Sequence, residues 1–210
     1  VAASNPISLD KDGIDENIGQ FEYLDKDTII TPFFTNKYCD HLIDCFEKIG
    51  WSIDEQGNYD TYLNKIEGGN DACKDFMESV KEKIEPEIVK NWTKAIKGRL
   101  WKYCPVPFGK KFSTKGQSEL KLHVDNSLMT LFIKLNDNFG GCETVFPRQN
   151  WNTGKLIKGS MIIIPGVITH PHYTNKLEWG TKYSLIGRIS ILDVRENKTY
   201  SDSIDALSSY

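Results

Sequence analysis

The chain has 210 residues and lacks any apolar run long enough to span a bilayer, which takes about 20 consecutive apolar residues in a helix. It also lacks a dense basic stripe, because its formal net charge is −3 and its acidic and basic residues are interspersed. Proteins that grip nucleic acid through many phosphates need such a stripe. We therefore expect neither a membrane nor a nucleic acid as a partner.

Cysteine pairs with metal or redox spacing are absent as well. The chain contains 5 cysteines, and none of them forms a Cys-x-x-Cys motif, which argues against zinc-ribbon and thioredoxin-like sites. An odd number of cysteines suits free thiols in a reducing compartment. The first residues show no charged region followed by an apolar one, so no secretory signal is visible and we expect a cytoplasmic protein. No sequence feature predicts the oligomeric state.

The N-terminal half reads as helical. Residues 1–20 are polar and are expected to form a flexible arm, and residues 21–210 suit one domain large enough to bury a core. Thr35 is a suitable N-cap for a helix whose apolar positions follow helical spacing, and Gly50 would end that helix. A second helical pattern follows, which Pro86 should end or kink.

The C-terminal half changes to short strands between turns. Residues 119–124 alternate between polar and apolar, residues 128–135 are rich in strand formers, and residues 159–166 hold a short apolar strand bounded by turn residues. Helices followed by strands favour an α+β fold. We expect helical support over residues 35–98 and a jelly-roll core over residues 99–192.

The most informative motif is His123-x-Asp125. Residues i and i+2 of a strand point to the same face, so these two side chains can act together. One further imidazole would complete a two-histidine, one-carboxylate triad, which holds Fe(II) and leaves open coordination positions. His170 and His172 are both candidates for the third ligand. Lys182 follows His172 by ten residues and is suited to an anionic co-substrate beside the metal.

Over about residues 99–192, the chain resembles the prolyl 4-hydroxylase-like branch of the 2-oxoglutarate/Fe(II) dioxygenases. The resemblance rests on a set of spaced motifs rather than on one of them. These motifs are His123-x-Asp125, Leu135-Asn136, the segment Gly141-Cys142-Glu143-Thr144-Val145-Phe146, Gly159, and His172 followed by Gly180 and Lys182.

The resemblance implies a double-stranded β-helix and a set of site residues. His123, Asp125 and His172 would bind Fe(II), His172 being preferred over His170 because Gly180 and Lys182 keep the family spacing from it. Lys182 would bind the 5-carboxylate of 2-oxoglutarate. O2 would be the second co-substrate and ascorbate a reductant, as the family implies. Asp125 is retained, which favours hydroxylation, and the substrate class would be a prolyl residue of a peptide or protein.

Three positions need separate comment. Lys134 stands where the family often has a tyrosine, and it either shares the 5-carboxylate or faces solvent. Arg188 stands where the prolyl hydroxylases usually have a tryptophan, and its forked donor suits a carboxylate on the substrate or on 2-oxoglutarate. Tyr103 matches a family tyrosine near the active site. Residues 109–116, rich in lysine and glycine, are expected to be a lid or a solvated loop.

Other functions remain open at this point. A free amino acid or another small anion is an alternative substrate for Arg188. The spacing from Lys182 to Arg188 also resembles the ending of the nucleic-acid demethylase branch, against which the acidic balance of the chain argues. A cupin-like metal-binding module without turnover is the alternative outside the enzymes.

Overall fold

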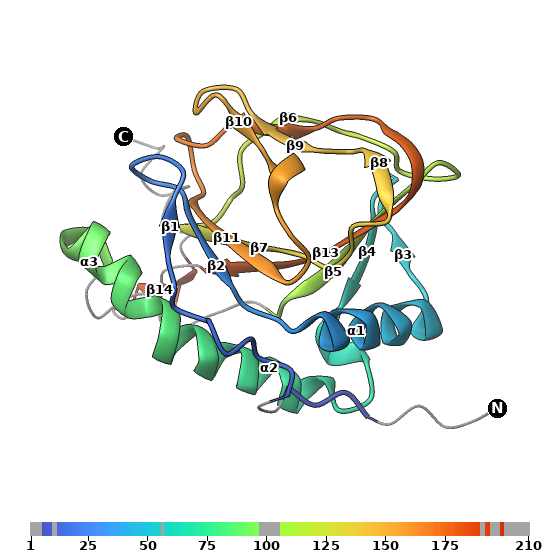
Figure 1. The fold of residues 1–210 in the computed structure, drawn as a ribbon, viewed down its shortest axis with the longest axis horizontal. Coiled ribbons are helices and arrows are strands. Elements are labelled where there is room, and N and C mark those ends of the chain that lie inside the picture. Colours follow the sequence, from blue (N-terminus) through green and yellow to red (C-terminus); the bar gives the residue numbers. More distant parts are fainter. Residues whose placement is uncertain are drawn as a thin grey trace.

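The computed structural model describes residues 6–9, 12–55, 57–96, 106–189, 192–193 and 198–199. Its helices are α1 Asn36–Ile49, α2 Gly69–Ser79 and α3 Glu85–Ile96, with a π-helical segment Val80–Ile84 between the last two and short 3-10 turns at Leu63–Lys65 and Thr153–Lys155. The helices lie together on one side of the strands (Figure 1).

Every strand pairing among the described residues is antiparallel. In chain order the strands are β1 Glu22–Tyr23, β2 Ile29–Pro32, β3 Ser52–Ile53, β4 Tyr59–Tyr62, β5 Phe108–Ser113, β6 Leu120–His123, β7 Met129–Lys134, β8 Phe139–Gly141, β9 Thr144–Phe146, β10 Trp151–Asn152, β11 Ser160–Pro165, β12 His172–Thr174, β13 Leu177–Ile189, β14 Leu192–Asp193 and β15 Lys198–Thr199.

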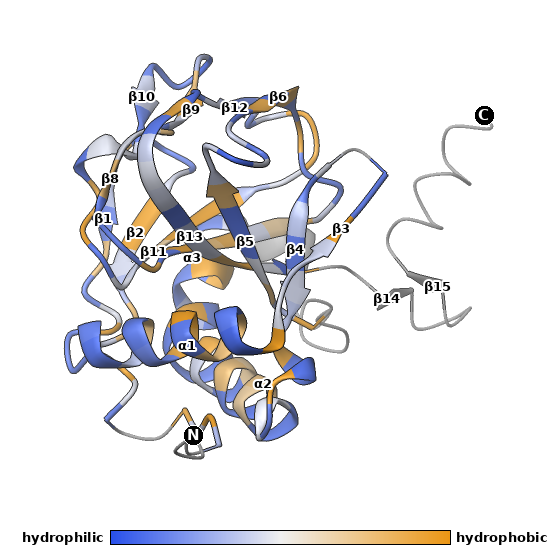
Figure 2. Ribbon diagram, turned by 90° about the vertical axis from the view of Figure 1, so that its right-hand side faces the viewer, coloured by the Kyte–Doolittle hydropathy of each residue, from blue (hydrophilic) through white to orange (hydrophobic). Residues whose placement is uncertain are grey.

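Two sheets make the body of the fold. The larger, nine-stranded sheet has the order β1-β2-β11-β7-β13-β5-β4-β3, with β8 paired to β13. The smaller, four-stranded sheet has the order β10-β9-β12-β6 and lies over one face of the larger sheet (Figure 1). The helices cover the opposite face of the larger sheet, and their apolar sides are turned toward it (Figure 2).

Successive side chains of a strand point to opposite faces of the larger sheet, and each face contributes to a different apolar cluster. Leu131, Ile133 and Leu185 face the helices and join the main core with Phe46 and Phe76. Side chains at the alternate positions of the strands of this sheet, such as Phe132, Ile162 and Ile164, point the other way, into the space between the two sheets. There they form a smaller apolar cluster with Phe146 from the smaller sheet. This alternation leaves the inner face of the larger sheet available for a site.

Helix α1 begins and ends as the sequence predicts. The Thr35 side chain accepts a hydrogen bond from the backbone N–H of Tyr38, and Gly50 caps the end of α1 at φ +87°. Pro86 does not end the second helical stretch. It lies in the first turn of α3, just after the π-helical segment, where its missing N–H removes one ordinary helical hydrogen bond.

The described part of residues 1–20 contacts the rest of the protein. Ile7 and Leu9 are buried in the main core, and Ile14 forms a β-bridge with Phe34, so the described part of this segment packs on the domain. The division of the chain into an arm and one domain stays a prediction.

The expected division into helices followed by strands needs two corrections. The strands β3 and β4 lie within residues 35–98, where only helical support was expected, and they extend the larger sheet. Residues 108–113 form strand β5, which pairs with β4 and β13, instead of a lid or loop, and only residues 114–116 form a turn. Lys110 and Lys111 find carboxylate partners in Asp60 and Glu47. No helix among the described residues combines the length and apolarity needed to cross a membrane.

Candidate metal centre

Strands β6 and β12 bring two histidines together at the edge of the space between the sheets. His123 and His172 are direct partners in the antiparallel pairing of these strands, and their ring centroids lie 4.3 Å apart. His172 is buried, while His123 is half-buried. The pair therefore presents two imidazoles to one point that solvent can reach from the side of His123.

Asp125 supplies the carboxylate. Its Oδ1 lies 4.0 Å from His123 Nε2, and its Oδ2 lies 3.8 Å from His172 Nε2. One donor atom from each of the three residues can be chosen so that all lie within 4.8 Å of one another. This is the group that the sequence motif predicts, and it is able to hold a metal ion.

Hydrogen bonds to the backbone fix which nitrogen each histidine offers. His123 Nδ1 lies 2.7 Å from the carbonyl oxygen of Lys121, and His172 Nδ1 lies 2.9 Å from that of His170. A carbonyl only accepts, so each Nδ1 carries the proton and each Nε2 keeps its lone pair for a ligand. Burial lowers the pKa of His172 and so favours its neutral form. Two neutral imidazole nitrogens and one carboxylate are ligands that suit a divalent transition metal.

His170 is turned away from this group. It is 1% exposed, and its ring nitrogens lie 3.1 Å from Thr28 Oγ1 and 3.0 Å from Thr169 Oγ1. Strand β12 begins only at His172, so the two histidines do not share a regular strand face. The structure thus brings His172, and not His170, to His123 and Asp125.

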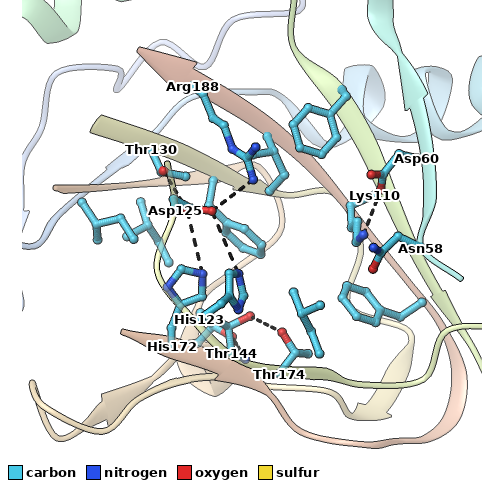
Figure 3. Close-up of a pocket in the computed structure, with 18 of the residues that line it drawn as sticks. Asn58, Asp60, Lys110, His123, Asp125, Thr130, Thr144, His172, Thr174 and Arg188 are labelled. Atoms are coloured by element: carbon cyan, nitrogen blue, oxygen red, sulfur yellow. Dashed lines mark hydrogen bonds and ion pairs between the residues drawn. The ribbon is translucent and has the colours of Figure 1, made fainter. Parts of the chain in front are cut away.

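A cavity of about 490 Å³ opens from the three candidate ligands. Figure 3 shows His123, His172 and Asp125 on one wall and Asn58, Asp60 and Lys110 on the wall across from them. The lining also includes the apolar side chains of Phe108, Phe132 and Ile164. An ion held by the triad would face this cavity.

Lys182 lies deep between the sheets and is 2% exposed. Its Nζ donates to the carbonyl oxygen of Cys142 at 2.7 Å and to Thr144 Oγ1 at 3.3 Å, both of which are uncharged. Burial is the main cause that lowers the pKa of Lys182 to about 8, and the nearby charge of Lys134 lowers it further. Ser184, two residues along the same strand face, is fully buried, and its Oγ has no hydrogen-bond partner among the described residues.

Lys134 is neither exposed nor in need of an external anion. Its side chain is 10% exposed, and its Nζ lies 2.6 Å from Asp137 Oδ1 and 2.6 Å from the carbonyl oxygen of Leu156. Both alternatives drawn from the sequence missed this internal partner. Lys134 and Lys182 line a second cavity of about 440 Å³, so a shared role toward an anion stays a prediction.

The last two residues that the sequence placed in the site are Arg188 and Tyr103. Arg188 reaches the main cavity, and its Nη2 donates to Asp125 Oδ1 at 3.1 Å, a contact that the sequence did not suggest. Tyr103 lies outside the described residues.

The sequence also missed the wall that faces the triad. Lys110 Nζ lies 2.9 Å from Asp60 Oδ1, and the two residues are direct partners on β5 and β4. The alternation of Phe108, Lys110 and Phe112 was a readable signal for an inward-facing lysine. No sequence signal pointed to Asp60, because its partner lies far along the chain.

Similar proteins come from one group of enzymes. The chain is 28% identical over 177 residues to the human procollagen-lysine,2-oxoglutarate 5-dioxygenase 2, a match that covers 75% of this chain and 23% of the relative. It is 25% identical over 188 residues to the procollagen lysyl hydroxylase and glycosyltransferase of Acanthamoeba polyphaga mimivirus, covering 83% of this chain and 21% of that protein. The chain thus spans about a fifth of the length of the curated relatives it matches. No protein-family model matches it.

Solved structures with a similar fold include two prolyl hydroxylases. The viral collagen prolyl hydroxylase of Paramecium Bursaria Chlorella virus-1, in its 2-oxoglutarate complex, aligns with a TM-score of 0.55 at 19% identity over 74% of this chain and 89% of that one. The Trichoplax adhaerens prolyl hydroxylase in complex with a hypoxia inducible factor peptide aligns with a TM-score of 0.59 at 13% identity over 88% of both chains. The resemblance to the 2-oxoglutarate/Fe(II) dioxygenases is confirmed. Within this superfamily, the likeness includes both prolyl and lysyl hydroxylases.

Proposed function

We propose that this chain is an Fe(II)- and 2-oxoglutarate-dependent dioxygenase, built on a double-stranded β-helix, that hydroxylates an unactivated C–H bond of a peptide or protein. The observation that carries the proposal is the group formed by His123, Asp125 and His172, whose donor atoms lie within 4.8 Å of one another at the wall of a cavity. When bound, iron and 2-oxoglutarate would supply the activation of O2, which no protein side chain can provide.

The residues around Lys182 fit the carboxylate of such a co-substrate. A buried ammonium whose described acceptors are only a carbonyl and a hydroxyl is incompletely compensated, and a carboxylate would complete it. The unpartnered hydroxyl of Ser184 offers a further donor on the same strand face. We assign the main contact to Lys182, because the charge of Lys134 is already paired with Asp137.

A prolyl residue is our first candidate for the substrate. It is supported by the fold shared with prolyl hydroxylases and by the sequence motifs. A lysyl residue is the second candidate, favoured by a specific observation: the relatives found by sequence are named as lysyl hydroxylases. The wall opposite the triad carries both a donor and an acceptor in Lys110 and Asp60, which suits a polar group of the substrate.

The compartment is a further part of the proposal. Cys39, Cys45, Cys73 and Cys142 are all free thiols, which suits the reducing cytoplasm.

The test is a turnover assay with Fe(II), ascorbate and 2-oxoglutarate under air. Prolyl peptides, lysyl peptides, free amino acids and a methylated oligonucleotide serve as substrates, and succinate and the oxidised product are measured separately. We expect product only with one class of peptide. Product from the free amino acids or the oligonucleotide would favour those alternatives, and an absence of succinate with every substrate would favour a non-catalytic metal-binding module.

A further inference from the structure

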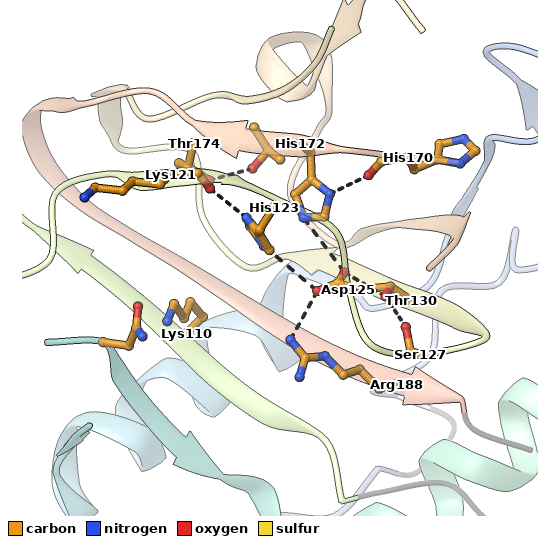
Figure 4. A network of polar contacts seen from close by, with 12 residues as sticks. Lys110, Lys121, His123, Asp125, Ser127, Thr130, His170, His172, Thr174 and Arg188 are labelled. Carbon is orange, nitrogen blue, oxygen red and sulfur yellow. Dashed lines mark hydrogen bonds and ion pairs between the residues drawn. The ribbon is translucent and has the colours of Figure 1, made fainter. Parts of the chain in front are cut away.

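The carboxylate of Asp125 is held by two donors on the side away from the histidines. Arg188 Nη2 donates to Oδ1 at 3.1 Å, and Thr130 Oγ1 donates to Oδ2 at 2.8 Å (Figure 4). Each oxygen of the carboxylate therefore has its own donor within the chain. Asp125 itself is 5% exposed, so these hydrogen bonds form in a largely dry environment where they are strong.

The register of the larger sheet explains why the two donors converge. Arg188 on β13 and Thr130 on β7 are direct partners across the antiparallel pair. Side chains of such partners start about 5 Å apart on the same face, so one carboxylate can contact both. Asp125 lies in the segment that enters β7, directly beside this pair.

Each donor is oriented by a further contact. The Ser127 and Thr130 hydroxyls lie 2.9 Å apart, and since Thr130 gives its proton to Asp125, Ser127 is the donor in this second bond. The guanidinium of Arg188 lies 5.4 Å from the centre of the Phe108 ring, a cation–π contact that limits its motion. These contacts connect the carboxylate with strands β7, β13 and β5, whose residues Thr130, Arg188 and Phe108 line the cavity.

We propose that Arg188 and Thr130 form a clamp that fixes the orientation of Asp125 as a metal ligand. Arg188 is then a positioning residue, in place of the substrate contact expected from the sequence. A carboxylate held at both oxygens cannot turn freely about its Cβ–Cγ bond, so an ion that reaches the two Nε2 atoms meets an oxygen already in place. The inference rests on the proposed function only in that the triad must bind a divalent metal.

Metal affinity without any co-substrate or substrate is the direct test. Co(II) binding is measured by calorimetry and by visible absorption for Arg188→Gln, Arg188→Lys, Thr130→Val and the unaltered chain. Partners of metal ligands usually contribute about 10–100-fold to metal affinity, so we expect losses of that size in Arg188→Gln and Thr130→Val. Arg188→Lys should retain part of the affinity. Arg148→Gln removes an exposed arginine as a matched control and should bind Co(II) normally.

The possible outcomes separate the clamp from the proposed function. If the unaltered chain binds Co(II) and both Arg188→Gln and Thr130→Val bind it equally well, the clamp is refuted while the enzyme assignment stands. A raised substrate KM in Arg188→Gln with unchanged Co(II) affinity would restore the substrate role of Arg188. If the unaltered chain itself does not bind Co(II), both proposals fall. Thr130→Val keeps the shape of the side chain, so it tests the clamp even if the arginine variants fold poorly.

Discussion

His123 and His172 are direct partners across the antiparallel strands β6 and β12, with their ring centroids 4.3 Å apart. Neighbouring strands lie about 4.8 Å apart, so this register alone brings the two imidazoles to one point. Asp125 then joins them from the residues just beyond β6. The candidate site is thus a consequence of strand pairing, and a slip of one residue in either strand would turn one histidine to the other face.

Removing the carboxylate should abolish the metal site. In Asp125→Ala we expect Co(II) binding and 2-oxoglutarate-dependent succinate formation to be lost, because two imidazoles alone leave the ion with too few protein ligands. Thermal unfolding should stay cooperative, since Asp125 lies outside the apolar clusters. Full activity in this variant would be incompatible with the assignment as a hydroxylase.

The two neighbouring histidines should respond differently to the same substitution. His172→Ala should lose metal and activity, because it removes one Nε2 from the triad. His170→Ala should keep metal, since its ring contacts Thr28 and Thr169 instead, and each lost hydrogen bond should lower the free energy of unfolding by about 1 kcal/mol. Metal content by mass spectrometry and urea unfolding separate these effects. Loss of metal in the His170 variant alone would mean that the register of β12 is wrong by two residues.

Local sequence signals were sufficient for the parts of the fold that depend on local physics. Thr35 and Gly50 predicted the ends of α1, because helix caps are satisfied by residues within one turn. The His-x-Asp spacing predicted that His123 and Asp125 act together. The structure brings them together, although β6 ends at His123 and Asp125 lies just beyond the strand.

What the sequence did not predict depends on partners far apart along the chain. Lys110 pairs with Asp60, although the sequence left its segment as a lid or a solvated loop. Arg188 contacts Asp125, which lies 63 residues away along the chain, although the sequence suggested a carboxylate of a ligand as its partner. The short strands β3 and β4 were hidden for the same reason, because a strand of a few residues is defined by its neighbour in the sheet. Lys134 is a local exception, since its partner Asp137 lies only three residues ahead.

Lys182 and Lys134 should contribute unequally to co-substrate binding. Losing one partner of a buried charged contact costs about 2–5 kcal/mol, so Lys182→Ala should raise the 2-oxoglutarate KM by roughly thirty-fold to several-thousand-fold. Co(II) affinity should stay near normal, because Lys182 contacts none of the three candidate ligands. Lys134→Ala should have a smaller effect, since Lys134 is already paired with Asp137. Equal effects of both substitutions would mean that the lysines share the carboxylate.

The affinity for 2-oxoglutarate should also depend on pH through Lys182. Burial is the main cause that lowers the pKa of this lysine to about 8, so the free protein loses the ammonium as the pH rises above that value. A neutral amine no longer attracts a carboxylate electrostatically, and the affinity should fall by up to about tenfold for each pH unit above 8. Anaerobic calorimetry with the metal-loaded protein measures this, and it should also detect proton uptake on binding near pH 8.5.

Lys182→Arg is the matched control for that profile, because a guanidinium stays protonated across the whole range. Its 2-oxoglutarate affinity should be flat between pH 7 and 9, and its binding should take up no proton.

The lowered pKa of Lys182 should also affect the stability of the protein without ligand, and in the direction opposite to its effect on affinity. An unfolded lysine titrates near 10.4, so between about pH 8 and 10.4 the unfolded chain holds a proton that the folded chain has released. Over this window Lys182 should therefore add to the free energy of unfolding as the pH rises, and Lys182→Arg should not. Identical pH profiles for the two proteins, in binding and in stability, would exclude Lys182 as the group that titrates at the co-substrate site.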